Sequence, residues 1–535
     1  MAIQAKCNVP REDRPPVMEA LEGRTLLSAN PYKFTDVDGD QVTISLTGSG
    51  TMAITPNASG IEDIKLGGTD PMASALKIGV IKKGGGNGLV NVGRIRTSRE
   101  SEGLKSLDAP TADITGSGGS GVRFSGYLGS VTLHSIADGA GLVACQTTQF
   151  GEVILYPSAL KSTVTVSVSV GDNSPIVFSS QIAKLTIGGN MGTGFIQAPA
   201  LGTVKIGGDF TGGIDDYFDV GSITVGGQVS GAWDTNYRSG AVGRITIGSS
   251  ASSWTLDTHG APIKSLTCNG QMDLTSITAS ALETLTVKNG MNGALTLDQT
   301  AAPVTLKTAK IGGQVQGTWT VSKAVGSITF GSSQAWSFQN ATTTVGSLTC
   351  NGNLHLTALL ALSVDTLTVK GNTQNGDMVF YQPVDPKKFA VKTAKIGGYV
   401  SNTFRAVGNI DSLTVGGIMN GNILAGTQPT VVNLAASSLA TDYLLDTANL
   451  SRINSLTVTG KVAGYGVENG DIIAGVLGKV ALNNVDTANA TPFGVAAAAI
   501  QSMTLKQPGD HVLHTWGKNW VANPADKFTV KVLTI

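Results

Sequence analysis

The sequence predicts an all-β fold, a single-chain parallel β-helix (β-solenoid) with about 19–24 residues in each coil. The first observation is a six-residue phrase that returns with this spacing. It reads Val-Gly-Ser-Ile-Thr-Val at 220–225 and Val-Gly-Ser-Leu-Thr-Cys at 345–350, and other copies begin at residues 182, 201, 242, 263, 282, 306, 325, 364, 391, 410, 453, 477 and 500. A fixed period indicates stacked units, none of which can bury its apolar face alone.

The second observation is the alternation inside the phrase. In Ile223-Thr224-Val225 two apolar residues flank a threonine, which is typical of a strand with one buried face. The third is composition. Glycine contributes 69 residues, nearly twice its usual share of about 7%, and charged residues are 14% against a usual figure of about 25%. We expect the Gly-Gly or Asn-Gly pairs after each phrase to turn the corner at positive φ.

A longer period indicates that the body grew by tandem duplication of a four-coil block. Val220, Leu306 and Val391 begin equivalent blocks, and Trp233, Trp319 and Phe404 each follow their block's start by 13 residues. Trp254 and Trp336 are a second equivalent pair. All four tryptophans share the parity of nearby apolar residues, so we expect them to point into the core.

The phrase also suggests how the chain is divided. Residues 1–30 form a sorting or export segment that we expect to be largely disordered, and residues 31–219 form an Asp-rich hairpin followed by irregular coils. Their looser phrases begin at residues 61, 92, 128 and 150. Residues 220–475 hold the duplicated blocks, with a degenerate copy around Val432 filling the wide gap between 410 and 453. Residues 476–535 form the last coils and a C-terminal cap.

The leader carries a family resemblance. Leu21-Glu-Gly-Arg-Thr-Leu-Leu-Ser-Ala29 resembles the LEPR-XLL motif found near the N-terminus of surface and secreted proteins of planctomycete bacteria, with Gly23 where that family has Pro or Asp. The resemblance covers nine residues. It implies an extracellular or cell-surface location and carries no catalytic meaning.

Three aspartates at alternate positions form the one candidate metal site. Asp36, Asp38 and Asp40 with Gly39 between them resemble the start of a calcium loop, because Ca²⁺ prefers several converging carboxylate oxygens. The alternative is a hairpin that turns at Asp38-Gly39 and returns along residues 41–46. A closing bidentate glutamate is missing, so both interpretations stay open. No other cofactor is indicated.

The charge and cysteine content exclude several functions. Lys+Arg and Asp+Glu are both 37, so no basic field exists to bind nucleic acid. No window reaches 18 consecutive apolar residues, so the sequence predicts no transmembrane segment. Cys268 and Cys350 occupy the same phrase position four coils apart, roughly 19 Å by strand spacing, which is too far for a disulfide. We expect both to be buried apolar residues.

These observations predict a non-catalytic structural or adhesive solenoid of the cell surface or extracellular space. Polysaccharide or other surface proteins are the expected partners, and an uncovered end would allow self-association. The alternative is a polysaccharide lyase or hydrolase of the pectin-degrading β-helix type. Asp215-Asp216, Asp219 and Thr258-His259-Gly260 resemble the acidic pair and Gly-His-Gly signature of polygalacturonases. His259, however, lies two coils beyond the acidic pair, and Thr258 replaces the first glycine.

Overall fold

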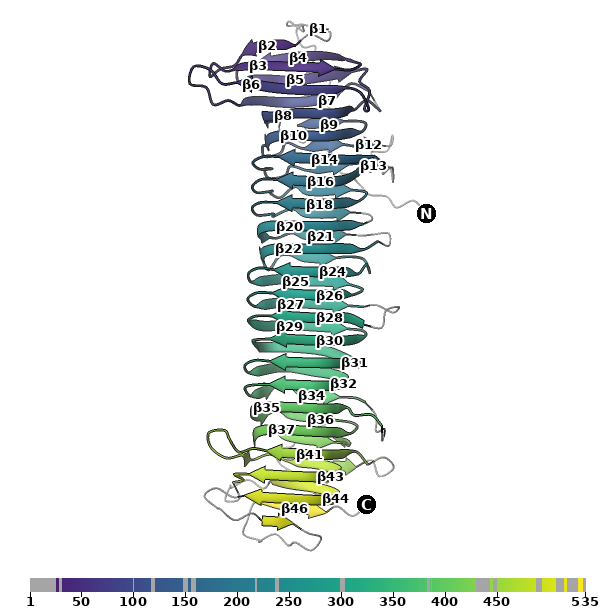
Figure 1. Ribbon diagram of the computed structural model, residues 1–535, viewed down its shortest axis with the longest axis vertical. Helices are drawn as coiled ribbons and strands as arrows, with labels where there is room; N and C mark the ends of the chain where they lie inside the picture. Colours follow the sequence, from purple (N-terminus) through teal and green to yellow (C-terminus); the bar gives the residue numbers. More distant parts are fainter. Residues whose placement is uncertain are drawn as a thin grey trace, which may run out of the picture. The chain divides into compact units, whose positions relative to one another are not determined.

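The computed structural model describes residues 26–27, 31–99, 101–116, 121–147, 153–154, 160–216, 219–235, 240–298, 304–382, 385, 387–429, 443–445, 450–486, 493–506, 514–516 and 528–532. The chain divides into two compact units. The first is Met1–Asn269 with Asp273–Thr275, and the second is Gly270–Met272 with Ser276–Ile535. Throughout the described residues every regular element is a β-strand, and the strands stack as a parallel β-solenoid of about 17 turns. Figure 1 shows this stacking within each unit.

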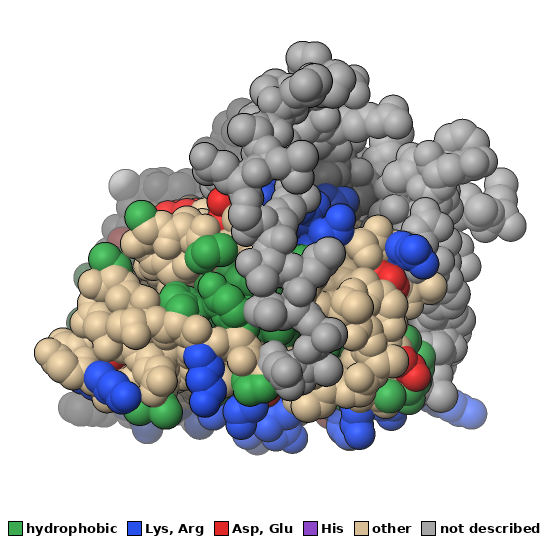
Figure 2. Space-filling view, turned by 90° about the horizontal axis from the view of Figure 1, so that it is seen from above, with side chains coloured by type: hydrophobic (Ala, Val, Ile, Leu, Met, Phe, Trp, Pro, Cys, Tyr) green, Lys and Arg blue, Asp and Glu red, His purple; other side chains and the backbone are tan. Residues whose placement is uncertain are grey.

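The first unit begins with an antiparallel cap. Strand β2 pairs with β3, β3 pairs with β6, and β1 and β5 both pair with β4. Seen from above, apolar side chains gather near the middle of the visible surface, and Lys and Arg side chains lie along the lower edge and also on the opposite side of the apolar region (Figure 2). The cap strands are β1 (Leu26–Leu27), β2 (Tyr32–Thr35), β3 (Gln41–Thr47), β4 (Thr51–Asn57), β5 (Gly60–Gly67) and β6 (Ala75–Ile81).

Below the cap, the phrase strands pair in parallel and in register. Val204 lies opposite Ile223, and Ile223 lies opposite Ile245, so equivalent phrase positions stack on one another. These strands are β8 (Leu104–Ile114), β10 (Leu128–Ile136), β14 (Lys161–Val166), β16 (Gln181–Ile187), β18 (Leu201–Ile206), β20 (Val220–Val229), β22 (Val242–Ser250) and β24 (Ile263–Cys268). Strand β7 (Val90–Thr97) instead pairs with β5 and, through Ile95, with Val122 of β9 (Val122–Phe124), so the phrases at 61 and 92 do not stand in line with the phrase at 128, whose neighbour is Leu104.

Successive coils also pair with each other at two further places outside the phrase strands. Single bridges join Val170, Met191, Phe210 and Val229 in order. A second wall of short parallel strands consists of β9 (Val122–Phe124), β11 (Leu142–Ala144), β15 (Ile176–Phe178), β17 (Phe195–Ala198), β19 (Gly213–Asp216), β21 (Ala232–Thr235) and β23 (Thr255–Asp257). Strand β25 (Met272–Ala279) has residues in both units.

The second unit repeats this plan. From Leu306 to Val391 the phrase strands make four successive in-register steps, as the four-coil block requires. The phrase wall is β26 (Leu282–Val287), β28 (Val304–Ile311), β30 (Ala324–Phe330), β31 (Ser332–Cys350), β32 (Leu354–Val369), β35 (Val391–Ser401), β37 (Ile410–Met419), β41 (Arg452–Val458), β43 (Ile472–Asn483) and β44 (Phe493–Lys506). The remaining parallel strands are β27 (Met291–Leu297), β29 (Gln314–Val321), β33 (Thr373–Asn375), β34 (Met378–Phe380), β36 (Thr403–Ala406), β38 (Asn422–Ala425), β42 (Val467–Glu468) and β46 (Phe528–Val532), and β45 (His514–Trp516) runs antiparallel to β44.

Two expected coils are absent from the stack. Ile410 pairs directly with Ile453, so no coil of the described stack lies between them, and Val432 itself lies outside the described residues. On this excursion β39 (Thr427–Pro429) pairs antiparallel with β40 (Tyr443–Leu445). The copy expected at Phe150 is also wrong, because Val131 pairs with Val164 of β14 instead. Strands β12 (Gln146–Thr147) and β13 (Val153–Ile154) form a side hairpin there.

The tryptophans lie inside the core, as their parity predicts. Trp233 and Trp254 meet edge to face with centroids 5.4 Å apart, and Trp319 and Trp336 repeat this arrangement at 5.7 Å. All four are at most 1% exposed, and none of the four indole N–H groups has a hydrogen-bond partner in the described part of the chain. The T-shaped contacts place ring edges against ring faces, a favourable electrostatic arrangement. Cys268 and Cys350 are likewise buried, as expected.

The corner glycines are required for a different reason from the expected one. Gly207 and Gly208 do not have the positive φ that we expected. Instead, a Cβ on Gly207 would lie 1.9 Å from the carbonyl oxygen of Gly188, and a Cβ on Gly208 would lie 1.9 Å from Oδ1 of Asn190. That Oδ1 accepts the N–H of Asp209 at 2.9 Å. The glycines therefore leave room for the preceding coil.

Across the described residues no helix is long and apolar enough to cross a membrane.

Candidate functional sites

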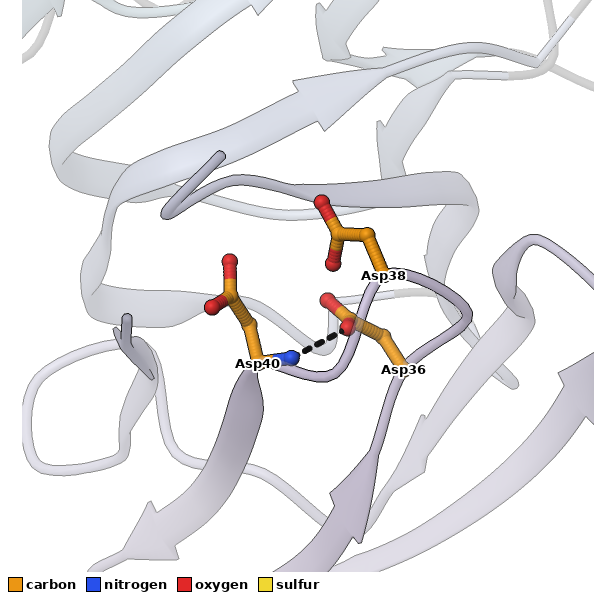
Figure 3. A group of neighbouring side chains, drawn as sticks. All are labelled: Asp36, Asp38 and Asp40. Atoms are coloured by element: carbon orange, nitrogen blue, oxygen red, sulfur yellow. Dashed lines mark hydrogen bonds between the residues drawn. The ribbon is translucent and has the colours of Figure 1, made fainter. Parts of the chain in front are cut away.

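The three N-terminal aspartates meet at the tip of the β2–β3 hairpin, where Gly39 turns the chain with φ 97°. Asp36, Asp38 and Asp40 each place a carboxylate oxygen within 4.8 Å of the other two (Figure 3). Oδ1 of Asp36 accepts the N–H of Asp40 at 2.8 Å. The hairpin interpretation of this segment is therefore confirmed.

These carboxylates hold a neighbouring loop against the hairpin. Asp40 is fully buried and accepts the N–H of Lys83 at 2.7 Å and that of Gly88 at 2.5 Å, one on each oxygen. Oδ2 of Asp38 accepts the N–H of Asn87 at 3.0 Å. Because these oxygens already serve backbone donors, few lone pairs converge on a common point, and the cluster fits a six- to eight-coordinate Ca²⁺ poorly. Calcium binding stays a prediction.

The two outer aspartates have different environments. Burial, followed by the hydrogen bond with Asp38, raises the pKa of Asp36 above its ordinary value. The backbone N–H of Asn87, followed by the hydrogen bond with Asp36, lowers the pKa of Asp38. Asp36 is therefore the carboxyl group of this pair that holds a proton more readily.

A second polar cluster, of three carboxylates and one amide, lies on the second wall of the first unit. Gln197, Asp215, Asp234 and Asp257 stand opposite one another on β17, β19, β21 and β23. We call these four residues the acidic column. Parallel strands lie about 4.8 Å apart, and like charges placed directly opposite destabilise a sheet. The column therefore needs compensating contacts.

Two side chains provide that compensation. Nε2 of Gln197 donates to Oδ2 of Asp215 at 2.8 Å, and Nε2 of His259 makes a short contact with Oδ1 of Asp234. The backbone N–H of His259 donates to Oδ1 of Asp257 at 2.8 Å, and this bond accompanies a left-handed φ of 47° at His259. The turn therefore aims the imidazole back along the column.

Within the column, Asp215 and Asp234 have different neighbours. Burial, and then the negative charge of Asp234, raise the pKa of Asp215, against the opposing effects of Gln197 and His259. Asp234 has the imidazole of His259 beside it. Two neighbouring carboxyl groups with different environments can divide the roles of acid and base.

The structure changes the sequence-based assignment of this site. Asp215 lies on the outer face, whereas Asp216 is fully buried, and Asp219 accepts the N–H of Ala241 at 3.0 Å. His259 does reach the preceding coil, where its partner is Asp234. The sequence analysis missed Asp234 and Asp257, because their positions in the column become apparent only when the coils are aligned on Asp215.

The outer face of the phrase wall in the second unit presents hydroxyl groups. Eight successive coils place their third and fifth phrase positions in two parallel rows, and all but two of these positions are Ser or Thr. We call these two rows the hydroxyl face. The first row is Thr284, Thr308, Ser327, Ser347, Thr366, Thr393, Ser412 and Ser455, and the second is Thr286, Lys310, Thr329, Thr349, Thr368, Lys395, Thr414 and Thr457.

All of these residues are partly or fully exposed. Within the described part of the chain no hydrogen bond joins any of their hydroxyl groups to another protein group. Other hydroxyl groups of the same unit do have protein partners: Oγ of Ser333 donates to the carbonyl of His355 at 2.9 Å, and Oγ1 of Thr373 donates to Asn402 at 2.8 Å. The hydroxyl face is therefore available to solvent or a ligand.

Comparisons with known protein families, with curated proteins and with solved structures find no match to this chain.

Proposed function

We propose that this chain is a non-catalytic structural or adhesive solenoid of the cell surface or extracellular space, with carbohydrate as a ligand. The observation that supports this most directly is that acidic side chains at the coil corners accept hydrogen bonds from the backbone of the next coil. Oδ1 of Asp138 accepts the N–H of Asp172, Oδ1 of Asp172 accepts that of Thr193, and Oδ1 of Asp209 accepts that of Gln228, at 2.7–2.9 Å. Each carboxylate therefore fixes the next coil.

Two further features support the proposal. The interior is repeated rather than varied, as the matching tryptophan pairs demonstrate, and duplication of a whole block suits a spacer or wall better than a single reaction centre. The segment at 21–29 that resembles the LEPR-XLL motif supports a surface location. Of that segment, Leu26–Leu27 form β1, and the rest lies outside the described residues.

Surface labelling and adhesion test the proposal. Intact producing cells are treated with a membrane-impermeant amine reagent, and the protein is then recovered and its labelled lysines are mapped. We expect labelling without cell lysis, and we expect beads coated with the purified protein to attach to polysaccharide-bearing surfaces. A protein that is labelled only after lysis would refute the surface assignment, and beads that attach to nothing would refute adhesion.

The acidic column favours a second candidate, a polysaccharide hydrolase. Asp215, with its raised pKa, would act as the general acid, and Asp234 would act as nucleophile or base. Adjacent coils place their backbones about 4.8 Å apart, near the separation of about 5–5.5 Å between carboxyl groups in retaining glycosidases. Three stacked carboxylates would repel an anionic pectin, so a neutral or amino-bearing glycan would be the substrate.

Turnover separates this candidate from the first. The wild type, Asp215→Asn and Asp234→Asn are incubated with neutral, amino-bearing and uronate polysaccharides, and reducing ends are measured. Asp219→Asn is the matched control, because its side-chain oxygen can still accept the N–H of Ala241. A hydrolase at this site requires turnover that both column variants lose and the control keeps. Absence of turnover on every substrate would rule it out.

A further inference from the structure

We infer that the hydroxyl face of the second unit is the carbohydrate-binding surface, and that its ligand is an extended neutral polysaccharide chain lying along the stacked coils. This inference rests on the proposed function, since it names the surface and the ligand class that adhesion would use. It concerns the second unit only, whereas the acidic column belongs to the first.

The periodicity of the face matches a linear polymer. Equivalent hydroxyl groups recur about every 4.8 Å from coil to coil, and the two rows lie about 6.6 Å apart along each strand. One coil therefore advances by roughly the length of one sugar ring. Each Ser or Thr hydroxyl offers one donor and two acceptor lone pairs, as does each sugar hydroxyl. A regular glycan can thus repeat the same contacts on successive coils.

The unpartnered state of the hydroxyl groups supports a ligand at this face. A hydroxyl that has no protein partner loses only water when a ligand hydrogen-bonds to it. Threonine is stiff at χ1, so little side-chain entropy is lost on binding. The central coils show this most clearly, because Thr329, Thr349 and Thr368 follow one another without interruption.

Charge and the placement of aromatic residues narrow the ligand class. Two lysines lie on β28 (Lys307 and Lys310) and two on β35 (Lys392 and Lys395). Acidic residues lie on β26 (Glu283), β32 (Asp365) and β37 (Asp411), so charges of both signs alternate along the wall and the face lacks a strong field of either sign. Tyr381 and Tyr465 are the exposed large aromatic residues among the described part of this unit, and both lie outside the phrase strands. Binding therefore depends on many hydrogen bonds along a neutral chain, and we expect long chains to bind much more tightly than short oligosaccharides.

The experiment measures binding of the full chain to insoluble cellulose, chitin and mannan by sedimentation. The test variant carries Thr329→Val, Thr349→Val and Thr368→Val, which remove hydroxyl groups and keep shape and strand preference. The matched control carries Thr296→Val, Thr318→Val and Thr320→Val, on strands β27 and β29 of another wall. We expect at least about tenfold weaker binding for the test variant and unchanged binding for the control. Should the triple variant unfold, the single exposed change Thr349→Lys provides the same test by steric obstruction.

The outcomes separate the inference from the proposed function. Equal binding by the test variant and the wild type would refute the hydroxyl face as the binding surface and would leave the proposed adhesive function untouched. A wild type that binds none of the three polymers would overturn the inference, while surface labelling would decide the proposed location independently. Because ordered hydroxyl groups also suit an ice lattice, inhibition of ice recrystallisation without polymer binding would show that the inferred ligand is wrong.

Discussion

Replacing Gly208 with alanine tests how successive coils recognise each other. The added Cβ would lie 1.9 Å from Oδ1 of Asn190, 3.0 Å from its Cγ and 3.1 Å from its backbone nitrogen. Only Oδ1 of Asn190 lies closer than a real Cβ tolerates, while Cγ and the backbone nitrogen make tight contacts that a small shift can relieve. Alanine at 208 must therefore displace the Asn190 side chain and break its hydrogen bond to the N–H of Asp209.

The size of the effect follows from these contacts. Overpacking costs about 1–3 kcal/mol, and the lost hydrogen bond costs about 1 kcal/mol, so we expect Gly208→Ala to cost about 2–4 kcal/mol. Asn190→Ala alone should cost only about 1 kcal/mol, because Asn190 is exposed and water can replace the lost acceptor. In the double variant the new Cβ occupies the vacated space, so its cost should approach that of Asn190→Ala.

Denaturant titration and hydrogen exchange at the amide of Asp209 measure the cycle. A long repeat protein need not unfold in one step, so local exchange reports the affected coil directly. Gly79→Ala is the control, because a Cβ there would meet no atom within 4 Å, and we expect stability unchanged or raised by up to about 1 kcal/mol. Additive costs in the double variant, or a harmless Gly208→Ala, would refute the steric explanation.

Three further predictions concern single side chains. Burial alone would raise the pKa of Glu102. The hydrogen bonds that its carboxylate accepts from Gly68, Ser98 and the backbone N–H of Arg99 outweigh burial and lower that pKa below its ordinary value of 4.5. Its stabilising contribution is thus present above pH 4.5 and lost as pH falls through the lower folded value. Glu102→Gln should cost about 1–3 kcal/mol at neutral pH and flatten the loss of stability in acid, as followed by thermal melts. Trp319→Ala should cost about 3–5 kcal/mol by leaving a core cavity, whereas Trp319→Phe should cost clearly less in the same melts, because the indole N–H has no partner to lose. Burial raises the pKa of the Cys350 thiol to about 11, so iodoacetamide at pH 8 should alkylate it only after unfolding, as read by mass spectrometry.

The coil positions could be predicted wherever apolar residues repeat at the same phrase positions. Val220 and Val242, for example, stand opposite each other as the phrase alignment requires. The failures at Phe150 and Val432 have a common cause. An apolar residue at suitable spacing does not reveal whether its segment joins the stack or leaves it, since that depends on which flanking phrases meet in space. Ile410 and Ile453 match each other well enough to close the stack without the segment between them.

The candidate sites were harder to predict than the fold. Asp38 and Asp40 are two residues apart in sequence, but the loop at 83–88 that their carboxylates hold could not be foreseen from this spacing. The acidic column joins residues from four coils, and it requires knowledge of which residue of each coil stands opposite Asp215. Sequence parity finds the face on which a side chain lies, while the partner across the coils depends on the register.

The fit between Gly208 and Asn190 also constrains how such a gene can change length. The backbone part of this fit recurs from coil to coil, since Gly207 meets the carbonyl of Gly188 and Gly226 that of Gly207. The side chain that is met differs, because Gly208 meets Asn190 and Gly227 meets Asp209, so removal of a single coil brings a glycine against a side chain that it does not otherwise contact. Recombination between equivalent corners of whole blocks, such as those beginning at Leu306 and Val391, keeps every pair together. Homologous exchange within the repeats would therefore yield viable longer or shorter chains mainly in block-sized steps. The lengths on which selection can act then differ by whole blocks.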